Sequence, residues 1–149
     1  MNIKKAFTLV ELLIVAMVIG ILVAIMTLSG SQATTTAKAS NILNDMRHIR
    51  DAARMYFWDN PDTSAPELKD LKNYIERFEA KETDIYENKI RENESGQWFL
   101  VATPDDERVR EKIAKKVAKD EIFGAPDTKT PYNPANATMY MFIRGNEKN

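Results

Sequence analysis

The first part of the sequence is an almost unbroken run of apolar residues. Residues 7–28 contain a single charged side chain, Glu11. As an α-helix rising about 1.5 Å per residue, this segment extends roughly 33 Å, which matches the hydrocarbon thickness of a bilayer. The pattern therefore predicts a helix long enough to cross a membrane.

The helical pattern continues beyond this run, but with only one apolar face. Apolar residues recur at steps of three and four, at Ile42, Met46, Ile49, Ala53 and Tyr56. We assign the intervening arginines, Arg47, Arg50 and Arg54, to a solvated face. Residues 59–66 are rich in Asp, Asn and Pro and end the helix.

Shorter elements follow. A second amphipathic helix, beginning near Ser64 and Pro66, is predicted from the spacing of Leu68, Leu71, Ile75 and Phe78. Residues 80–95 are polar, with an edge strand expected over residues 85–90. Two apolar segments, 97–103 and 138–144, predict strands, and the first of them follows a Ser-Gly turn and is expected to be buried.

A third helix is predicted after residue 103. We expect Thr103 to cap it, Pro104 to occupy its first position, and acidic residues to fill its first turn. Its inner face consists of Val109, Ile113 and Val117, and its far end carries Lys115, Lys116 and Lys119. A proline-rich loop follows Gly124. The predicted fold class is α+β: a long N-terminal helix, half transmembrane and half amphipathic, packed against a small globular head with an antiparallel sheet.

Composition narrows the possible functions. A chain of 149 residues fits one domain plus the N-terminal segment. The net charge is −1, and removal of residues 1–6 takes away two of 21 basic residues, leaving 19 against 22 acidic ones, or −3. Because neither value gives a basic field, no nucleic-acid partner is expected. The absence of cysteine excludes disulfides and thiol chemistry.

The N-terminal segment has three interpretations. Lys4 and Lys5 precede the apolar run, which keeps the N-terminus cytoplasmic and sends the rest of the chain outward. A secretory signal, cut near residues 31–33, normally has an apolar core of only about 7–15 residues and no charge within it. A plain single-pass anchor fits the length but assigns no role to Glu11.

The third interpretation is a resemblance to a known family. The segment from Lys4 to Val15, KKAFTLVELLIV, resembles the class III signal of bacterial type IV pilins and type II secretion pseudopilins. The resemblance implies that a membrane prepilin peptidase cuts between Ala6 and Phe7 and methylates the new amino group of Phe7. Glu11 then becomes the fifth residue of the mature chain, and Gly20 matches a glycine common in the family's helix. Two departures are Ala6, where the family usually has glycine, and Leu28, where many pilins have proline.

This processing explains why a carboxylate is tolerated in an apolar helix. A charge near the bilayer centre costs roughly 2.5–3.5 kcal/mol on insertion scales. Cleavage creates a cationic amine at Phe7, and in a filament Glu11 of one subunit neutralises that amine on its neighbour, because a paired charge is much less costly than a lone one. Glu11 also lies near the positive end of the helix dipole.

The expected organisation follows from the resemblance. Residues 1–6 form a leader, residues 7–28 the transmembrane and filament-core helix, residues 29–58 its continuation into the head, and residues 59–149 the head. The expected function is a structural subunit of a type IV pilus or type II secretion pseudopilus. It begins as a single-pass precursor in the cytoplasmic membrane and ends in a periplasmic or extracellular filament. Its partners are other pilins in a homo- or hetero-polymer, the prepilin peptidase and an inner-membrane assembly platform. The alternative is a membrane-anchored or secreted binding protein that does not polymerise.

The sequence carries few other signs of chemistry. No phosphate-binding glycine loop, nucleophile elbow or histidine pair is present, so neither an enzyme nor a cofactor is expected. Asp120, Glu121 and Asp127 offer oxygen ligands for calcium, but their spacing is not diagnostic, and solvated loop acids are the favoured interpretation. His48 is expected to be exposed or hydrogen-bonded. The aromatic residues Trp98, Tyr140 and Phe142 are expected to serve the core rather than a base-stacking surface.

Overall fold

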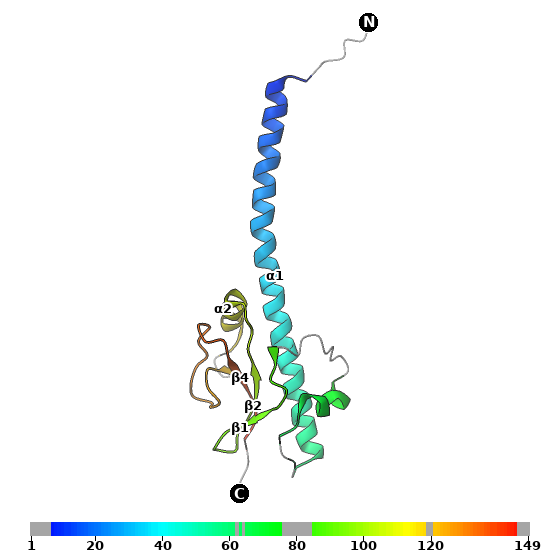
Figure 1. The fold of residues 1–149 in the computed structure, drawn as a ribbon, viewed down its shortest axis with the longest axis vertical. Helices are drawn as coiled ribbons and strands as arrows, with labels where there is room; N and C mark the ends of the chain where they lie inside the picture. The colour runs from blue at the N-terminus through cyan, green and yellow to red at the C-terminus, as the bar shows by residue number, and fades with distance from the viewer. Residues whose placement is uncertain (1–6, 62, 64, 76–84, 119–120, 146–149) are drawn as a thin grey trace. The chain divides into compact units, whose positions relative to one another are not determined.

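The computed structural model describes residues 7–61, 63, 65–75, 85–118 and 121–145. They form helix α1 (Leu9–Asp59), the 3-10 helix η1 (Leu68–Tyr74), strand β1 (Arg91–Glu92), strand β2 (Trp98–Ala102), helix α2 (Glu107–Lys116), strand β3 (Ile122–Phe123) and strand β4 (Met139–Arg144) (Figure 1). The residues group into two compact units, divided between Thr35 and Thr36. A long N-terminal helix and a small antiparallel sheet are the predicted α+β architecture.

The first unit consists of the N-terminal part of α1. Its large apolar side chains are exposed all round the helix, from Leu9 to Met26, with exposed fractions between 50% and 78%. Among the described residues, α1 alone has the length and apolar composition needed to cross a membrane. Helical structure continues through Gly30 and residues 34–36, where the Thr34 hydroxyl donates to the Gly30 carbonyl at 3.3 Å.

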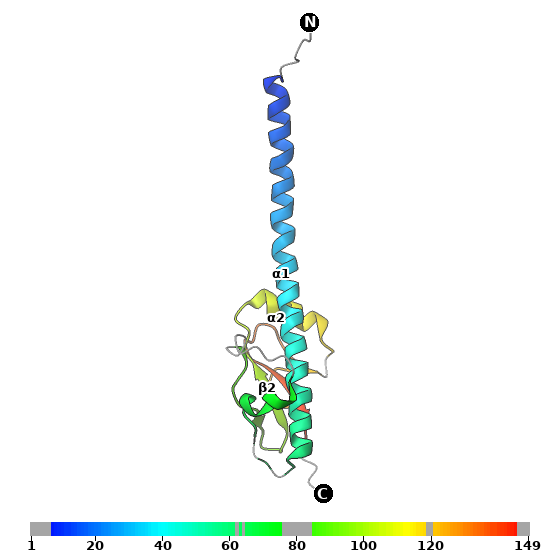
Figure 2. The same cartoon turned by 90° about the vertical axis from the view of Figure 1, so that its right-hand side faces the viewer.

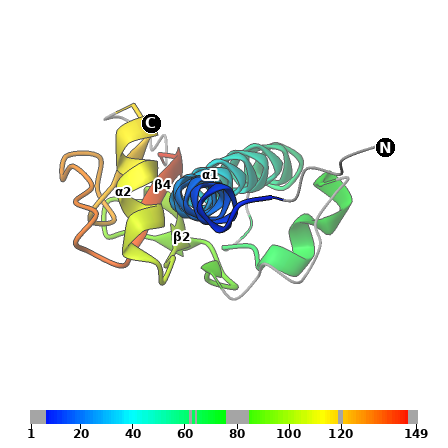
Figure 3. The ribbon, with the colours of Figure 1, turned by 90° about the horizontal axis from the view of Figure 1, so that it is seen from above.

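The second unit is the head, built on a four-stranded antiparallel sheet. The strand order is β1-β2-β4-β3, with Leu100 and Ile122 both opposite Met141. The part of α1 that belongs to the head crosses in front of this sheet in Figure 2. Viewed from above, β4 and α2 lie on one side of this part of α1 and η1 on the other (Figure 3).

The core lies between α1 and the sheet. The predicted apolar face of the helix is confirmed, since Ile42, Met46, Ile49 and Ala53 are buried and Tyr56 is half-buried. From the sheet, alternate residues of β2 and β4 enter the same cluster: Trp98, Leu100, Ala102, Met139, Met141 and Ile143. Burial of each large apolar side chain stabilises the fold by roughly 1.5–3 kcal/mol, so this contact contributes strongly to the stability of the head.

The sheet also has a second, smaller apolar face. Phe99 and Val101 are fully buried although they point away from α1. Phe142 lies opposite Phe99, with ring centroids 5.7 Å apart. Trp98 is in the core as predicted, with its ring centroid 5.0 Å from that of Phe57. Tyr140 and Phe142, however, are half-buried on the second face, because successive residues of β4 point to opposite sides.

Helix α2 begins later than predicted. Its cap is Asp106, whose carboxylate accepts a hydrogen bond from the Arg108 amide at 2.9 Å, and the first helical residue is Glu107. The Thr103 amide donates to the Ile85 carbonyl at 2.7 Å, so the strand pairing continues past β2 and the helix cap lies three residues after the predicted one. The predicted inner face is correct for Val109 and Ile113, which are buried, while Val117 ends the helix. Lys119 lies outside the described residues.

The region between α1 and β2 also differs from the prediction. The second helix is a 3-10 helix that begins after Glu67, and its buried residues are Leu68 and Leu71. Ser64 and Phe78 lie outside the described residues. Residues 85–90 form only isolated bridges, and the edge strand is β1. The reason is that the backbone near residue 89 pairs with η1: Leu68 N–H donates to the Asn88 carbonyl at 2.8 Å.

Strand β3 was not predicted. Ile122 and Phe123 pair with Met141 and Tyr140 of β4, and both are buried. Two apolar residues are too few for an alternating pattern to appear in the sequence.

Candidate assembly site

The candidate site is the start of α1, where Phe7, Thr8 and Glu11 lie. The Glu11 carboxylate Oε2 accepts hydrogen bonds from the Thr8 backbone N–H at 2.8 Å and from the Thr8 hydroxyl at 2.7 Å. In return, the Glu11 N–H donates to the Thr8 hydroxyl oxygen at 3.3 Å. This reciprocal pair is a capping box, which satisfies backbone donors that the first turn of a helix would otherwise leave unpaired.

The capping box gives Glu11 a partner within its own chain. The resemblance alone implies a partner for Glu11 only in a neighbouring subunit. The signal for the additional partner was nonetheless present, because Thr-x-x-Glu before an apolar run is the capping-box pattern. The hydrogen bonds also hold the carboxylate close to Phe7, whose side chain is 76% exposed.

Of the other residues predicted for processing and assembly, the structure describes only Gly20. Lys4, Lys5 and Ala6 lie outside the described residues. Gly20 lies in the exposed part of α1, and a Cβ added to it would meet nothing within 4 Å. Nothing within the described chain therefore requires a glycine at this position.

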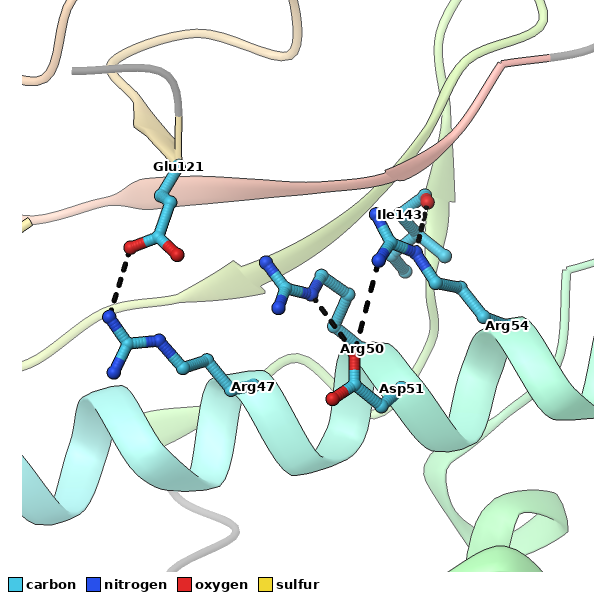
Figure 4. Close-up of polar contacts among 6 residues, drawn as sticks. All are labelled: Arg47, Arg50, Asp51, Arg54, Glu121 and Ile143. Carbon is cyan, nitrogen blue, oxygen red and sulfur yellow. Dashed lines mark hydrogen bonds and ion pairs between the residues drawn. The ribbon is translucent and has the colours of Figure 1, made fainter. Parts of the chain in front are cut away.

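The arginines of α1 are more than a solvated face, which corrects the prediction (Figure 4). Arg47 Nη2 lies 3.0 Å from Glu121 Oε2, and Arg54 Nε donates to the Ile143 carbonyl at 2.8 Å. Arg50 pairs with its neighbour Asp51 at 3.3 Å. Two of the three side chains thus join the helix to the β3 and β4 side of the head. His48 is exposed, in agreement with its prediction.

The calcium candidates are engaged in other contacts. Glu121 pairs with Arg47. Asp127 accepts hydrogen bonds from the backbone N–H groups of Thr130 at 2.6 Å and Lys129 at 2.9 Å, which hold its pKa below the usual value. Asp120 lies outside the described residues. Within the part of the chain that the structure describes, no three His, Cys, Asp or Glu side chains come together as a metal site.

The loop between β3 and β4 is held by side-chain donors. Asn93 Nδ2 donates to the Pro126 carbonyl at 2.8 Å, and Arg110 Nε donates to the Pro134 carbonyl at 2.9 Å. Arg110 is only 9% exposed, and its Nη1 also donates to the carbonyls of Pro104 and Asp105, each at 2.8 Å. The sequence pattern does not single out this residue, because charged residues on helices are mostly exposed to solvent.

The phenol of Tyr132 in this loop makes a pH prediction possible. Burial raises its pKa to about 12, although the Arg110 charge acts in the opposite direction. Since the unfolded value is about 10, the contribution to stability is fully present below that pH and is lost as pH rises towards 12. We expect Tyr132→Phe to reduce the loss of stability between about pH 9 and pH 12. Thermal unfolding at a series of pH values measures this loss, and equal losses in both proteins would contradict the assignment.

Comparisons with known proteins find a matching N-terminal motif and a similar fold. Residues 1–27 match the family model described as the prokaryotic N-terminal methylation motif. A comparison with curated protein sequences finds no match. Among solved structures, the major type IV pilin PilA1 from Clostridium difficile matches with a TM-score of 0.53 at 19% identity, covering 75% of this chain and 98% of that one. The predicted resemblance is thus confirmed: the chain carries the prokaryotic N-terminal methylation motif and has the fold of a type IV pilin.

Proposed function

We propose that the protein is a structural subunit of a type IV pilus or type II secretion pseudopilus. The observation that carries the proposal is the exposed apolar surface of α1 between Leu9 and Met26. Soluble monomers rarely expose contiguous apolar patches larger than a few hundred Å². Such a surface requires lipid in the precursor and other subunits in the assembled state. The methylation motif at residues 1–27 supports the same assignment.

The proposed cycle has three steps. The precursor is held in the cytoplasmic membrane by residues 7–28, with the leader on the cytoplasmic side. A prepilin peptidase then cuts between Ala6 and Phe7 and methylates the Phe7 amine. An assembly platform finally transfers the subunit into the filament, where the apolar helices pack together in the interior and residues 59–149 lie outside. The open space at Gly20 permits a close approach of a neighbouring helix.

Glu11 sets the axial register in this proposal. In lipid, its two hydrogen bonds from Thr8 reduce the cost of the unpaired carboxylate. In the filament, the carboxylate pairs with the Phe7 amine of a neighbour. Apolar burial supplies most of the cohesion, and the charge pair favours one register over others.

The proposal predicts the chemical form of the mature N-terminus. Mass spectrometry of protein taken from the membrane and from surface filaments is expected to find N-methyl-phenylalanine at residue 7. Ala6→Leu should block cleavage, because the peptidase accepts a small residue before the cut, and the uncut precursor should accumulate in the membrane. A mature chain that begins near Thr34 or retains Met1 would contradict the proposal and indicate an anchored or secreted protein instead.

A further inference from the structure

Two large apolar side chains of the head are exposed. Met55 is 58% exposed and Trp58 is 87% exposed, whereas the other large apolar residues described in the head are buried or half-buried. They are three residues apart near the end of α1, so they lie on the same face of the helix. Tryptophan is enriched in the energetically dominant positions of protein interfaces. An indole left almost wholly in solvent is therefore a candidate contact residue.

The surroundings of Trp58 carry charges of both signs, since Asp59 lines a second hollow beside it and Asp51 lies 3.9 Å from Arg54. A hollow of about 470 Å³ lies beside Trp58, with Arg54 and Arg144 in its lining. The Arg144 guanidinium carbon lies 4.0 Å from the centroid of the Phe57 ring. Its Nε is shielded from solvent and has no hydrogen-bond partner among the described residues. We call Met55, Trp58, Arg54 and Arg144 the Trp58 surface; its chemical complement is an apolar hollow with a carboxylate placed to meet the Arg144 guanidinium.

The same head provides such a hollow elsewhere. Residues from the start of the head part of α1, from residue 85 and from the entry to α2 border an open hollow of about 300 Å³. Its apolar lining is Ile42, Ile85, Pro104 and Val109, and its polar lining is Lys38, Asn41, Asp105 and Asp106. Asp105 is exposed and makes no ion pair with any described residue. We call this site the Val109 hollow.

The two surfaces lie at different positions along α1. The Val109 hollow uses residues 38–42 of the helix, whereas the Trp58 surface uses residues 54–58. A separation of sixteen residues corresponds to roughly 24 Å along a helix. Because the two surfaces are far apart, Trp58 cannot reach the Val109 hollow of its own subunit. It can reach the Val109 hollow of a second subunit that is displaced along the helix axis.

We propose that Trp58 of one subunit inserts into the Val109 hollow of the next copy of the chain, with the Arg144 guanidinium facing Asp105. The volume of the hollow is at the lower end of the range for ligand pockets and is sufficient for one indole. Such a contact is heterologous, and repeating it without closure generates an open helical assembly. This inference rests on the proposed function and adds a contact between heads to the packing of the apolar helices.

Crosslinking tests the contact directly, because the chain contains no cysteine. In the full chain, Met55→Cys and Lys38→Cys place one thiol at each surface and leave Trp58 in place. Treating assembled filaments with a short bismaleimide should give a ladder of dimers, trimers and higher species. Filaments mixed from the two single variants should give dimers only. The matched control pairs Met55→Cys with Lys129→Cys, an exposed residue outside the Val109 hollow, and should give no ladder.

Loss of the indole gives the second test. Trp58→Ala is expected to lower filament yield at least about tenfold, with the membrane pool and its cleavage at Phe7 unchanged. His48→Ala, at an exposed position of the same helix outside both surfaces, should assemble like the wild type. Wild-type yield from Trp58→Ala, or filaments of the double-cysteine variant without a ladder, would overturn this contact while leaving the proposed function intact. Absence of filaments from the wild-type chain would overturn both.

Discussion

Replacing Glu11 with alanine is expected to reduce filament yield at least about a hundredfold while cleavage between Ala6 and Phe7 continues. The substitution leaves the cationic amine of a neighbouring Phe7 without a carboxylate in an apolar interior. Removal of one partner from a buried ion pair costs roughly 3–5 kcal/mol, and each 1.4 kcal/mol is about a factor of ten. The measurement is the amount of subunit in sheared filaments, compared with the processed subunit in the membrane.

Thr8→Ala is the matched control for this experiment. It removes the hydroxyl of the capping box but retains the Glu11 carboxylate. Loss of an N-cap typically costs about 1 kcal/mol, which corresponds to a reduction of roughly fivefold. If the two variants lose the same amount of filament, Glu11 acts only as a helix cap, and the pairing between subunits is wrong.

Arg110→Met is expected to lower the free energy of unfolding of the head by roughly 3 kcal/mol or more. Hydrogen bonds from charged groups contribute about 1.5–3 kcal/mol each, and a buried acceptor left without a donor costs about 1–3 kcal/mol. Arg110 donates to three carbonyl groups, those of Pro104, Asp105 and Pro134. Methionine fills a similar volume but provides no donor, so the entry to α2 and the loop before β4 lose their common partner.

Arg108→Met separates this effect from a general loss of charge on α2. Arg108 is exposed, and its ion pair is with Asp106, 3.4 Å away. Exposed ion pairs contribute little, so a change within about 0.5 kcal/mol is expected. Chemical unfolding of the full chain in detergent, followed by near-ultraviolet circular dichroism, measures both variants. Equal stability of the Arg110 and Arg108 variants would show that the buried guanidinium contributes nothing to the head.

The loop between β3 and β4 is held by hydrogen bonds from side chains and not by a disulfide. The sequence contains no cysteine, so no disulfide can constrain this loop. The structure provides Asn93 and Arg110, which donate to the carbonyl groups of Pro126 and Pro134. Proline supplies a carbonyl acceptor while removing a backbone donor that would need its own partner. A few side-chain donors are therefore enough to hold the loop.

Predictions from the sequence were most accurate where the pattern was long. The apolar face of α1 recurs over enough residues for its helical period to be recognised, and β2 stands out as a continuous apolar run. Predictions were wrong at element boundaries, as at the start of α2, where Thr103 pairs with Ile85 instead of capping the helix. They also missed β3, whose two residues form a strand only because β4 lies beside them.

By itself, the sequence determined the length and apolar composition that suit the N-terminal helix to a membrane, the position of Glu11 within it and the capping box that Thr8 offers. These features depend on residues within a few positions of one another, so a linear pattern contains all of their physics. Only the tertiary structure decided the partners of Arg47, Arg54 and Arg110, because those contacts join residues 74, 89 and 24 positions apart. It likewise decided that Trp58 is exposed and that a hollow forms near Val109. Such contacts depend on which surfaces the chain brings together when the core is buried, and no local pattern specifies that outcome.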